Sequence, residues 1–181
     1  MFLKSEHLYL RALEPADLDF LYSLENDVAI WPVSNTSAPY SKYVLQQYIE
    51  QATADIYTVK QLRLLICTLG HQPAGVIDLF DFEPSHARAG IGIIIVPAFR
   101  KKHFATQALD LLLHYCQNTL YLHLVYCSVT VNNTASIRLF EQAGFKNTGC
   151  RQQWLKTPQG WQDVLDFQKI FTSAALNSSN I

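Results

Sequence analysis

The sequence predicts a mixed α/β fold, in which one sheet carries helices on both of its faces. Two patterns indicate this class. Segments with alternating or continuous apolar residues, typical of strands, are interspersed with segments whose apolar residues recur every three or four positions, typical of helices. Pro, Gly, Asn and Ser residues separate these segments. The resulting order, β-α-α-β-β-β-α-β-α-β-β, mixes consecutive strands with strands joined through a helix.

The first part of the chain predicts one strand and two helices. Residues 7–11 (HLYLR) alternate in polarity, and Pro15 suits the first turn of a helix in which leucines recur at helical spacing. Residues 31–39 hold two prolines beside Ser, Asn and Thr, which favours a loop. Ser41 is placed to cap a second helix, whose apolar stripe is Val44, Leu45, Tyr48, Ile49 and Ala52.

The middle of the chain predicts three strands and a long helix. Residues 62–69 and 74–82 are strand candidates on either side of a turn. Residues 89–96 (AGIGIIIV) are almost continuously apolar and rich in β-branched side chains, as in a central strand. Pro97 ends this strand, a basic loop follows, and residues 105–117 carry a broad apolar helical face.

The last part predicts a strand over residues 123–131, a short helix over residues 134–143 and further strands from Phe145. Asn133 is placed to cap the short helix, and Gly144 fits a left-handed residue at its end.

The C-terminal residues predict a closing hairpin. The limits of the domain are predicted from the absence of a linker or repeat. Residues 152–156 and 161–171 flank a Pro158-Gln159-Gly160 turn. An exposed edge of this hairpin is one place where a second copy could bind, which makes a homodimer possible. There is no linker and no repeat, so we expect a single domain over residues 1–172 and a tail over residues 173–181.

Composition and charge describe an ordinary globular chain. Its 181 residues carry a net charge of −1, which gives no bulk attraction to nucleic acid or to an anionic membrane. The N-terminus is unlike a signal peptide, and the longest apolar stretch, residues 91–99, is too short to span a bilayer. The cysteines and histidines lack metal-ligand spacing, so we expect free thiols and no metal. The expected location is the cytoplasm.

The strongest chemical signal is a basic loop between a strand and a helix. Arg100, Lys101, Lys102 and His103 precede the helix, whose first backbone N–H groups and positive dipole end form an anion site. Phosphate or pyrophosphate is the natural ligand. The alternative is a solvated basic turn at a helix start.

Three segments at this spacing resemble the GNAT superfamily, the Gcn5-related N-acetyltransferases. The residues 100–105 (RKKHFA) stand where the family has (Q/R)-x-x-G-x-(G/A). Residues 131–145 (VNNTASIRLFEQAGF) resemble its N-x-x-S-x-x-(L/Y)-(Y/F)-x-x-x-G-F segment, and residues 88–92 (RAGIG) resemble its fourth strand. Within the family the chain is most similar to the branch of bacterial spermidine acetyltransferases and ribosomal-protein N-terminal acetyltransferases, through residues 75–79 and on to Ile95.

The resemblance implies a GNAT fold and an acetyl-CoA cosubstrate. The central sheet would be mostly antiparallel and splayed between residues 91–96 and 123–131, with the pantetheine arm in the gap. Backbone groups near Ile94, Ile95 and Val96 would bond the arm like an added strand, and one N–H would polarise the thioester carbonyl. The implied cofactor-binding residues are Ile94, Ile95, Val96, Arg100, Lys101, Lys102, His103, Phe104, Ala105, Thr106, Asn133, Ser136 and Phe140.

Three of these positions carry an alternative or a departure from the family. Asn133 is either a plain helix cap or a cap that also bonds the pantetheine arm. His103 replaces the family's Gly, which costs about 1–2 kcal/mol if the position is strained. Phe140 stands where many members have a tyrosine that protonates the leaving thiolate, and it is expected to pack against the arm or the core. Tyr126, Tyr115 or water are the remaining proton donors.

The acceptor amine must lose a proton before it attacks, since an alkylamine has a pKa near that of lysine, about 10.4. Asp78 stands where the spermidine enzymes carry a catalytic glutamate, and it is a base, an amine anchor or a salt-bridged residue. Asp81 is a second candidate. In a regular strand it faces the opposite side of the sheet from Asp78, and a bulge changes that facing.

The loop over residues 26–40 is expected to border the acceptor site. Glu25, Trp31 and Tyr40 are the candidate substrate-binding residues, because acidic and aromatic side chains suit a cation. Core packing is the alternative for Trp31. The spermidine enzymes have a richer acidic cluster in this loop.

The expected function is transfer of an acetyl group from acetyl-CoA to a primary amine by direct attack on the thioester. The acceptor is a small amine, a polyamine or a protein N-terminus. One alternative is a module that binds acetyl-CoA or CoA with little turnover, which His103 and Phe140 favour. The other is an unrelated phosphate-binding α/β protein, which would lack the splayed strands.

Overall fold

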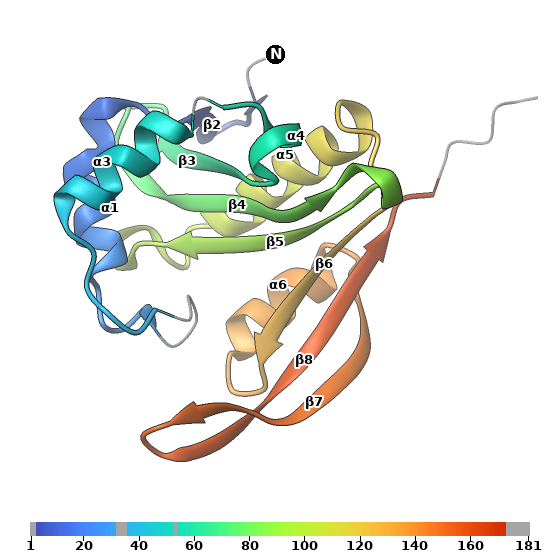
Figure 1. Cartoon of the computed structure of the whole chain (residues 1–181). Coiled ribbons are helices and arrows are strands. Elements are labelled where there is room, and N and C mark those ends of the chain that lie inside the picture. Colours follow the sequence, from blue (N-terminus) through green and yellow to red (C-terminus); the bar gives the residue numbers. More distant parts are fainter. Residues whose placement is uncertain (1–2, 32–35, 53, 173–181) are drawn as a thin grey trace, which may run out of the picture.

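The computed structural model describes residues 3–31, 36–52 and 54–172, and these residues form one sheet with helices around it (Figure 1). The strands are β1 (Leu3–Lys4), β2 (Leu8–Ala12), β3 (Leu62–Thr68), β4 (Pro73–Glu83), β5 (Arg88–Ile95), β6 (Leu124–Thr130), β7 (Lys146–Thr157) and β8 (Gly160–Ile170). The helices are α1 (Leu18–Glu25), α3 (Lys42–Gln51), α4 (Ile56–Val59), α5 (Phe104–Asn118) and α6 (Thr134–Gln142). In the described ranges no helix combines the length and apolarity that crossing a membrane requires.

The strand order in the eight-stranded sheet is β1-β2-β3-β4-β5-β6-β8-β7. All neighbouring pairs are antiparallel except β5 and β6, which are parallel. The predicted mixed α/β class and the mostly antiparallel sheet are therefore confirmed. β1 and α4 were not predicted from the sequence, because two and four residues are too few to display a period.

The predicted helix ends are also present. The Ser41 side chain accepts a hydrogen bond from the Val44 N–H, and the Asn133 side chain accepts one from the Ser136 N–H. Gly144 adopts a φ of +85° directly after α6, as the left-handed cap requires. Residues 32–35 of the predicted loop and the predicted tail over 173–181 lie outside the described residues.

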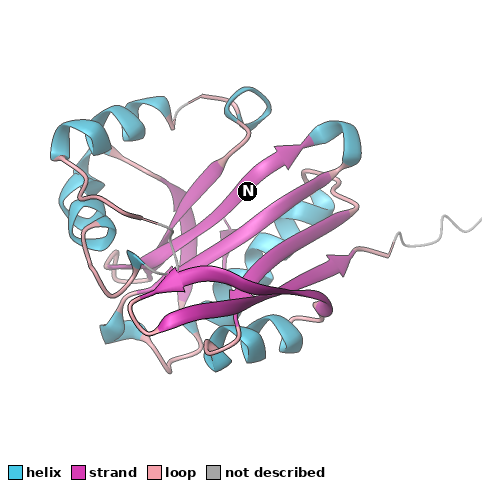
Figure 2. Ribbon diagram, turned by 60° about the horizontal axis from the view of Figure 1, so that its bottom comes forward, coloured by secondary structure: helices cyan, strands magenta, loops and turns pink. Residues whose placement is uncertain are grey.

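Two apolar cores lie on the two faces of the sheet. The larger core packs α5 and α6 against one face, and it draws on β2, β3, β4, β5, β6 and β8. The smaller core packs α1 and α3 against the other face of β3, β4 and β5. On that second face, no helix within residues 3–31, 36–52 and 54–172 packs on β6 and β8, and β7 is mostly exposed. The β7–β8 hairpin comes to the front in Figure 2.

The sheet splays between β5 and β6. The parallel pairing covers only three positions, from Arg88 with Leu124 to Gly90 with Tyr126. Beyond this point the two strands continue without pairing and separate (Figure 1). We call the Gly90–Tyr126 position the vertex. The expected splay is confirmed, and its position follows from the short ladder.

A bulge interrupts β4 near its end. The register with β5 shifts between Phe80 and Glu83, and Asp81 has a φ of +48°. Phe82 N–H bonds to Lys60 O instead of to β5. The strand is therefore irregular at Asp81, and of the two alternatives left by the sequence, a regular strand or a bulge that changes the facing of Asp81, the bulge is present. The bulge turns Asp81 toward Tyr126 on the face that carries Asp78, away from the larger core.

Candidate functional site

The loop between β5 and α5 exposes a helix N-terminus. Lys101 and His103 both have a φ of +60°, and His103 is the N-cap of α5 without a side-chain hydrogen bond to the helix. The first-turn residues of α5 are half-buried, and they are Phe104, Ala105 and Thr106. Their backbone N–H groups have no partner within the helix, which leaves an anion site at this end. The left-handed His103 explains why the family favours glycine here.

The other two basic residues of this loop bond to its backbone. Arg100 Nε donates to Ile95 O at 2.9 Å, and Lys102 Nζ donates to Ala98 O at 2.9 Å. Lys102 Nζ also lies 5.6 Å from the centre of the Phe99 ring. These bonds hold the loop against the end of β5, so its positive charge stays at the start of α5.

The strand β5 offers the gap only part of its backbone. Val96 N–H donates to Ala74 O at 3.0 Å, so this donor is already used across the sheet. Ile95 O accepts from Arg100, and the side chains of Ile94 and Val96 pack against the smaller core. Ile94 pairs with Val76 two positions further along the same antiparallel ladder, so its backbone is also committed to β4, and Ile95 is the predicted position whose backbone turns toward the gap.

The helix α6 lines the region beyond the vertex. Asn133 Oδ1 accepts from the Ser136 N–H at 3.1 Å, so the helix-cap role of Asn133 is present. Phe140 is 3% exposed and meets Phe145 edge to face with ring centres 5.1 Å apart. Phe140 therefore packs in the core and offers no group that donates a proton.

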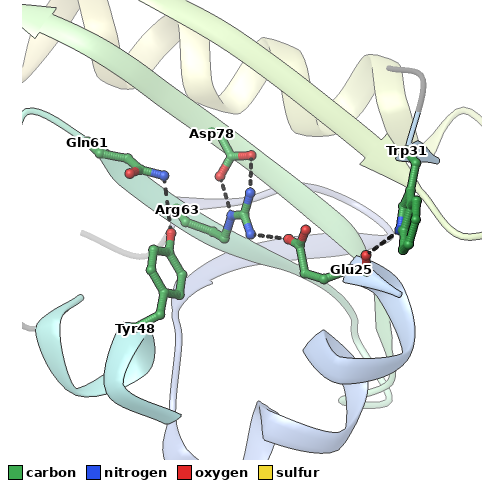
Figure 3. A network of polar contacts seen from close by, with 6 residues as sticks. All are labelled: Glu25, Trp31, Tyr48, Gln61, Arg63 and Asp78. Atoms are coloured by element: carbon green, nitrogen blue, oxygen red, sulfur yellow. Dashed lines mark hydrogen bonds and ion pairs between the residues drawn. The ribbon is translucent and has the colours of Figure 1, made fainter. Parts of the chain in front are cut away.

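A buried ion network lies on the α1 and α3 side of the sheet (Figure 3). Arg63 of β3 donates to both oxygens of Asp78 on β4, with Nε–Oδ1 at 2.6 Å and Nη2–Oδ2 at 3.0 Å. Its Nη1 also donates to Glu25 Oε1 at the end of α1. Burial alone would lower the pKa of Arg63, but Asp78 and Glu25 hold it above its usual value, so the guanidinium stays charged. We call Glu25, Arg63 and Asp78 the Arg63 network.

Two aromatic residues, Tyr48 and Trp31, contact members of the Arg63 network (Figure 3). The Arg63 guanidinium lies 5.5 Å from the Tyr48 ring centre, and Gln61 Nε2 donates to the Tyr48 hydroxyl at 3.2 Å. Burial raises the pKa of Tyr48. Trp31 Nε1 donates to Glu25 O at 2.9 Å, which ties the start of the acceptor loop to α1.

Tyr40 occupies the other end of that loop. Its backbone N–H donates to Asn26 Oδ1 at 2.9 Å, and its carbonyl accepts from Asn26 Nδ2 at 3.0 Å. Its side chain is 38% exposed. The structure thus joins Trp31 directly to Glu25 and ties Tyr40 to Asn26, the residue that follows Glu25.

A second polar group lies at the vertex. The Tyr126 hydroxyl donates to Asp81 Oδ2 at 3.3 Å, and the Phe80 ring meets the Tyr126 ring edge to face at 6.1 Å. Burial, and then the charge of Asp81, raise the pKa of Tyr126. A pocket of about 430 Å³ opens beside them, lined by Asp81, Glu83, Arg88, Leu124, Tyr126 and Gln168. We call Phe80, Asp81 and Tyr126 the vertex site.

The sequence analysis did not identify Arg63. The available signal was a single cation inside the apolar segment 62–69, because a charge in a buried strand requires a partner. Asp78 is the anion opposite Arg63 in the register of β3 and β4, with apolar neighbours on both sides in its strand. Together the two would have predicted a cross-strand ion pair.

Comparison with known families gives one domain match. The family model described as an acetyltransferase (GNAT) domain matches residues 7–146, which is most of the chain. The matched region includes the splayed strands, the α5 N-terminus and α6.

Two curated relatives and one solved structure extend this match. The chain is 28% identical to the spermidine N(1)-acetyltransferase of Vibrio cholerae serotype O1, over 97% of this chain and 99% of that protein. It is also 28% identical to the spermidine N(1)-acetyltransferase of Escherichia coli K12, over 77% and 73%. The crystal structure of the Vibrio cholerae spermidine N-acetyltransferase in complex with CoA and spermine has a TM-score of 0.84 and 26% identity, covering 92% of this chain and 96% of that one.

Proposed function

The chain belongs to the GNAT family of acetyltransferases and is an acetyl-CoA-dependent N-acetyltransferase, and we propose that its acceptor is an aliphatic amine of the polyamine class. The relatives named as spermidine acetyltransferases support this class, since the likeness to one of them covers almost the whole of both chains. The observation that carries the proposal is the splay of β5 from β6 above an uncapped α5 N-terminus. The single domain over residues 1–172 belongs to the same proposal.

The residues of the splay fit acetyl-CoA, which supplies the activated acetyl group. The first-turn N–H groups of α5 and the cations of the preceding loop suit its pyrophosphate, with Lys101 exposed at the turn. The backbone of Ile95 lies at the open end of the gap, close to Arg100. Asn133 and Ser136 at the start of α6 border the opposite wall. We assign these groups to binding of the cosubstrate.

The acceptor side has a net negative charge. The Arg63 network combines two carboxylates with one guanidinium, so one negative charge remains near Glu25. Trp31 and Tyr40 add aromatic surface to this side, and such surroundings suit an alkylammonium. A carboxylate on the acceptor side other than Asp78, whose two oxygens both bond to Arg63, then takes up the amine proton, directly or through water. Because Phe140 carries no hydroxyl, we assign protonation of the released thiolate to water.

Two further features belong to the proposal. The exposed Trp154 and Trp161 on the β7–β8 hairpin, with 55% and 60% of their surface accessible, support a homodimer formed through this hairpin. Three buried free cysteines, Cys67, Cys116 and Cys127, support a reducing compartment such as the cytoplasm.

A second acceptor class is favoured by one observation. Both oxygens of Asp78 bond to Arg63, which leaves this carboxylate poorly placed to remove a proton. An α-amino group has a pKa of about 7.7–8.0 and is partly neutral without help, whereas an alkylamine near 10.4 is not. A peptide N-terminus therefore needs less help from a general base in the site than a polyamine does.

The test combines binding with turnover. Calorimetry measures CoA binding, and thiol release from acetyl-CoA is then followed with spermidine, a simple monoamine and a short peptide with a free N-terminus. We expect CoA binding and the fastest thiol release with spermidine. Binding with no thiol release on any amine would replace the proposal by a CoA-binding module, and faster release with the peptide would establish the second acceptor class.

A further inference from the structure

We propose that the vertex site binds the ammonium group of the acceptor, with Asp81 as its anionic partner and Tyr126 as its aromatic wall. The proposal rests on the proposed function, because an amine acceptor is what gives this pocket its ligand. It assigns the acceptor to Asp81 and not to Asp78, which lies three residues earlier on the same strand.

Asp78 is closed to a ligand. Its carboxylate is 9% exposed and gives both oxygens to Arg63. A ligand ammonium at Asp78 would have to displace a buried guanidinium, which would leave that cation without its main partner. We therefore assign Asp78 a structural role as the partner of Arg63, and no role in binding the acceptor.

Asp81 has the opposite surroundings. The bulge in β4 turns it to the open face of the sheet, where its residue is exposed. Within the described part of the chain it makes a single hydrogen bond, the long one from the Tyr126 hydroxyl at 3.3 Å. A hydroxyl held this weakly is able to rotate, so both Asp81 and Tyr126 can turn to a ligand.

The position at the vertex connects this site to the gap. The gap is open at the α5 end of β5 and closes at Gly90 and Tyr126. A molecule anchored by its phosphates at α5 and running along β5 therefore directs its other end toward Tyr126. The Phe80 ring covers Gly90 closely, since a Cβ there would lie 2.2 Å from the ring. Phe80 and Tyr126 thus lie where the acetyl end of acetyl-CoA and the acceptor amine would come together.

The charge of the pocket selects a cation. Glu83 is paired with Arg88 at 2.6 Å, so these two side chains cancel. Lys60 lines an adjoining hollow with Asp81 but forms no ion pair with it in the described structure. The carboxylate of Asp81 is left as the excess charge beside two aromatic rings, which is an arrangement that suits an alkylammonium.

The test is calorimetry of spermidine binding to the CoA-loaded protein, repeated for the variants Asp81→Asn and Tyr126→Phe. The matched control is Asp110→Asn, an exposed aspartate on α5 on the other side of the sheet. We expect Asp81→Asn to weaken spermidine binding by about tenfold or more, as loss of a charged partner does, and Tyr126→Phe to weaken it less. CoA affinity and the control variant are expected to match the wild type.

The outcomes separate this proposal from the proposed function. Spermidine binding that is equal in Asp81→Asn and wild type, or absent in the wild type, would overturn the assignment of the vertex site. If spermidine binds through Asp81 but no thiol is released from acetyl-CoA, the site stands and the acetyl transfer to polyamines is refuted. Circular dichroism of each variant checks that a loss of binding does not come from unfolding.

Discussion

Asp78 of the Arg63 network and Asp81 of the vertex site lie on the same strand, β4, and on the same face of the sheet, yet the two carboxylates have opposite environments. Asp78 is buried and bonded twice to one guanidinium, whereas Asp81 is exposed and holds one long hydrogen bond. The difference comes from the covering elements. Helices α1 and α3 close the sheet over Asp78, and among the described residues no helix covers the face beside β6 and β8. We therefore expect the buried carboxylate of Asp78 to stabilise the fold and the exposed carboxylate of Asp81 to be available to a ligand.

The largest expected effect on the free energy of unfolding comes from removing Arg63. The substitution Arg63→Met leaves Glu25 and Asp78 buried without a cation, and breaking a buried pair in this way costs about 3–5 kcal/mol. Urea denaturation measures the free energy of unfolding of both proteins.

The control for this variant is Arg151→Met. Arg151 also bonds both oxygens of an aspartate, Asp166, but about a third of each side chain is exposed. Exposed pairs of this kind contribute about 0–1 kcal/mol. If the two variants lose similar stability, burial is not what distinguishes the Arg63 network.

Adding a methyl group at Gly90 tests how closely the Phe80 ring packs on the vertex. In Gly90→Ala the new Cβ would lie 2.2 Å from the Phe80 ring, which must move away from Tyr126. Overpacking of this kind costs about 1–3 kcal/mol, and thermal unfolding measures it. In Gly92→Ala the nearest atom would lie at 3.8 Å, so that variant is expected to be as stable as the wild type. Equal loss in both variants would contradict the close cover of Gly90 by Phe80.

A third test asks whether a closed carboxylate elsewhere shows the expected pH dependence. Asp17 is 6% exposed and bonds Arg11 at 2.7 and 2.8 Å and the Glu14 N–H at 2.8 Å. Burial raises its pKa, but the hydrogen bonds from Arg11 and Glu14 outweigh burial and hold the pKa below the usual value. The charged form therefore stabilises the fold by about 1–2 kcal/mol at neutral pH, with allowance for the partly exposed Arg11.

The sign of this effect fixes the pH window. Because the folded pKa is depressed, the stabilisation is complete above the unfolded pKa of about 3.9 and is lost as the pH falls through the folded value. Urea denaturation at several pH values should show Asp17→Asn less stable than wild type at pH 7, with the gap narrowing below about pH 4. Asp19→Asn, at an exposed position, is the control. A gap that stays constant into acid would refute the assigned role of Asp17.

Much of the fold follows from the sequence because its strands and helices have distinct periods and clear ends. The continuous apolar segment before Pro97 becomes β5, and Ser41, Asn133 and Gly144 occupy the helix ends that their chemistry predicts. The splay was expected from the resemblance to the family, and the short β5–β6 ladder gives its position.

The site follows less completely, because it depends on contacts between distant segments. Arg63 is the single charge of β3, whereas β4 carries Asp78, Asp81 and Glu83, and only the register of β3 with β4 shows that Asp78 is the partner of Arg63. The side of the sheet on which Asp81 lies depends on a bulge in β4, and no local sequence pattern predicts that bulge. Phe140, in contrast, was predictable in part: it was expected to pack against the arm or the core, and its side chain is 3% exposed and lies in the core.

The sheet also fixes the order in which the chain can fold. The strands β3, β4 and β5 follow one another through short turns, and β7 and β8 close at Thr157 and Gly160, so these hairpins need only local contacts. Leu8 of β2 pairs with Thr68 of β3, and this pairing must enclose α1, α3 and α4. Loop-closure entropy makes such a contact late and slow. During synthesis β2 therefore leaves the ribosome well before the strand that completes its hydrogen bonds.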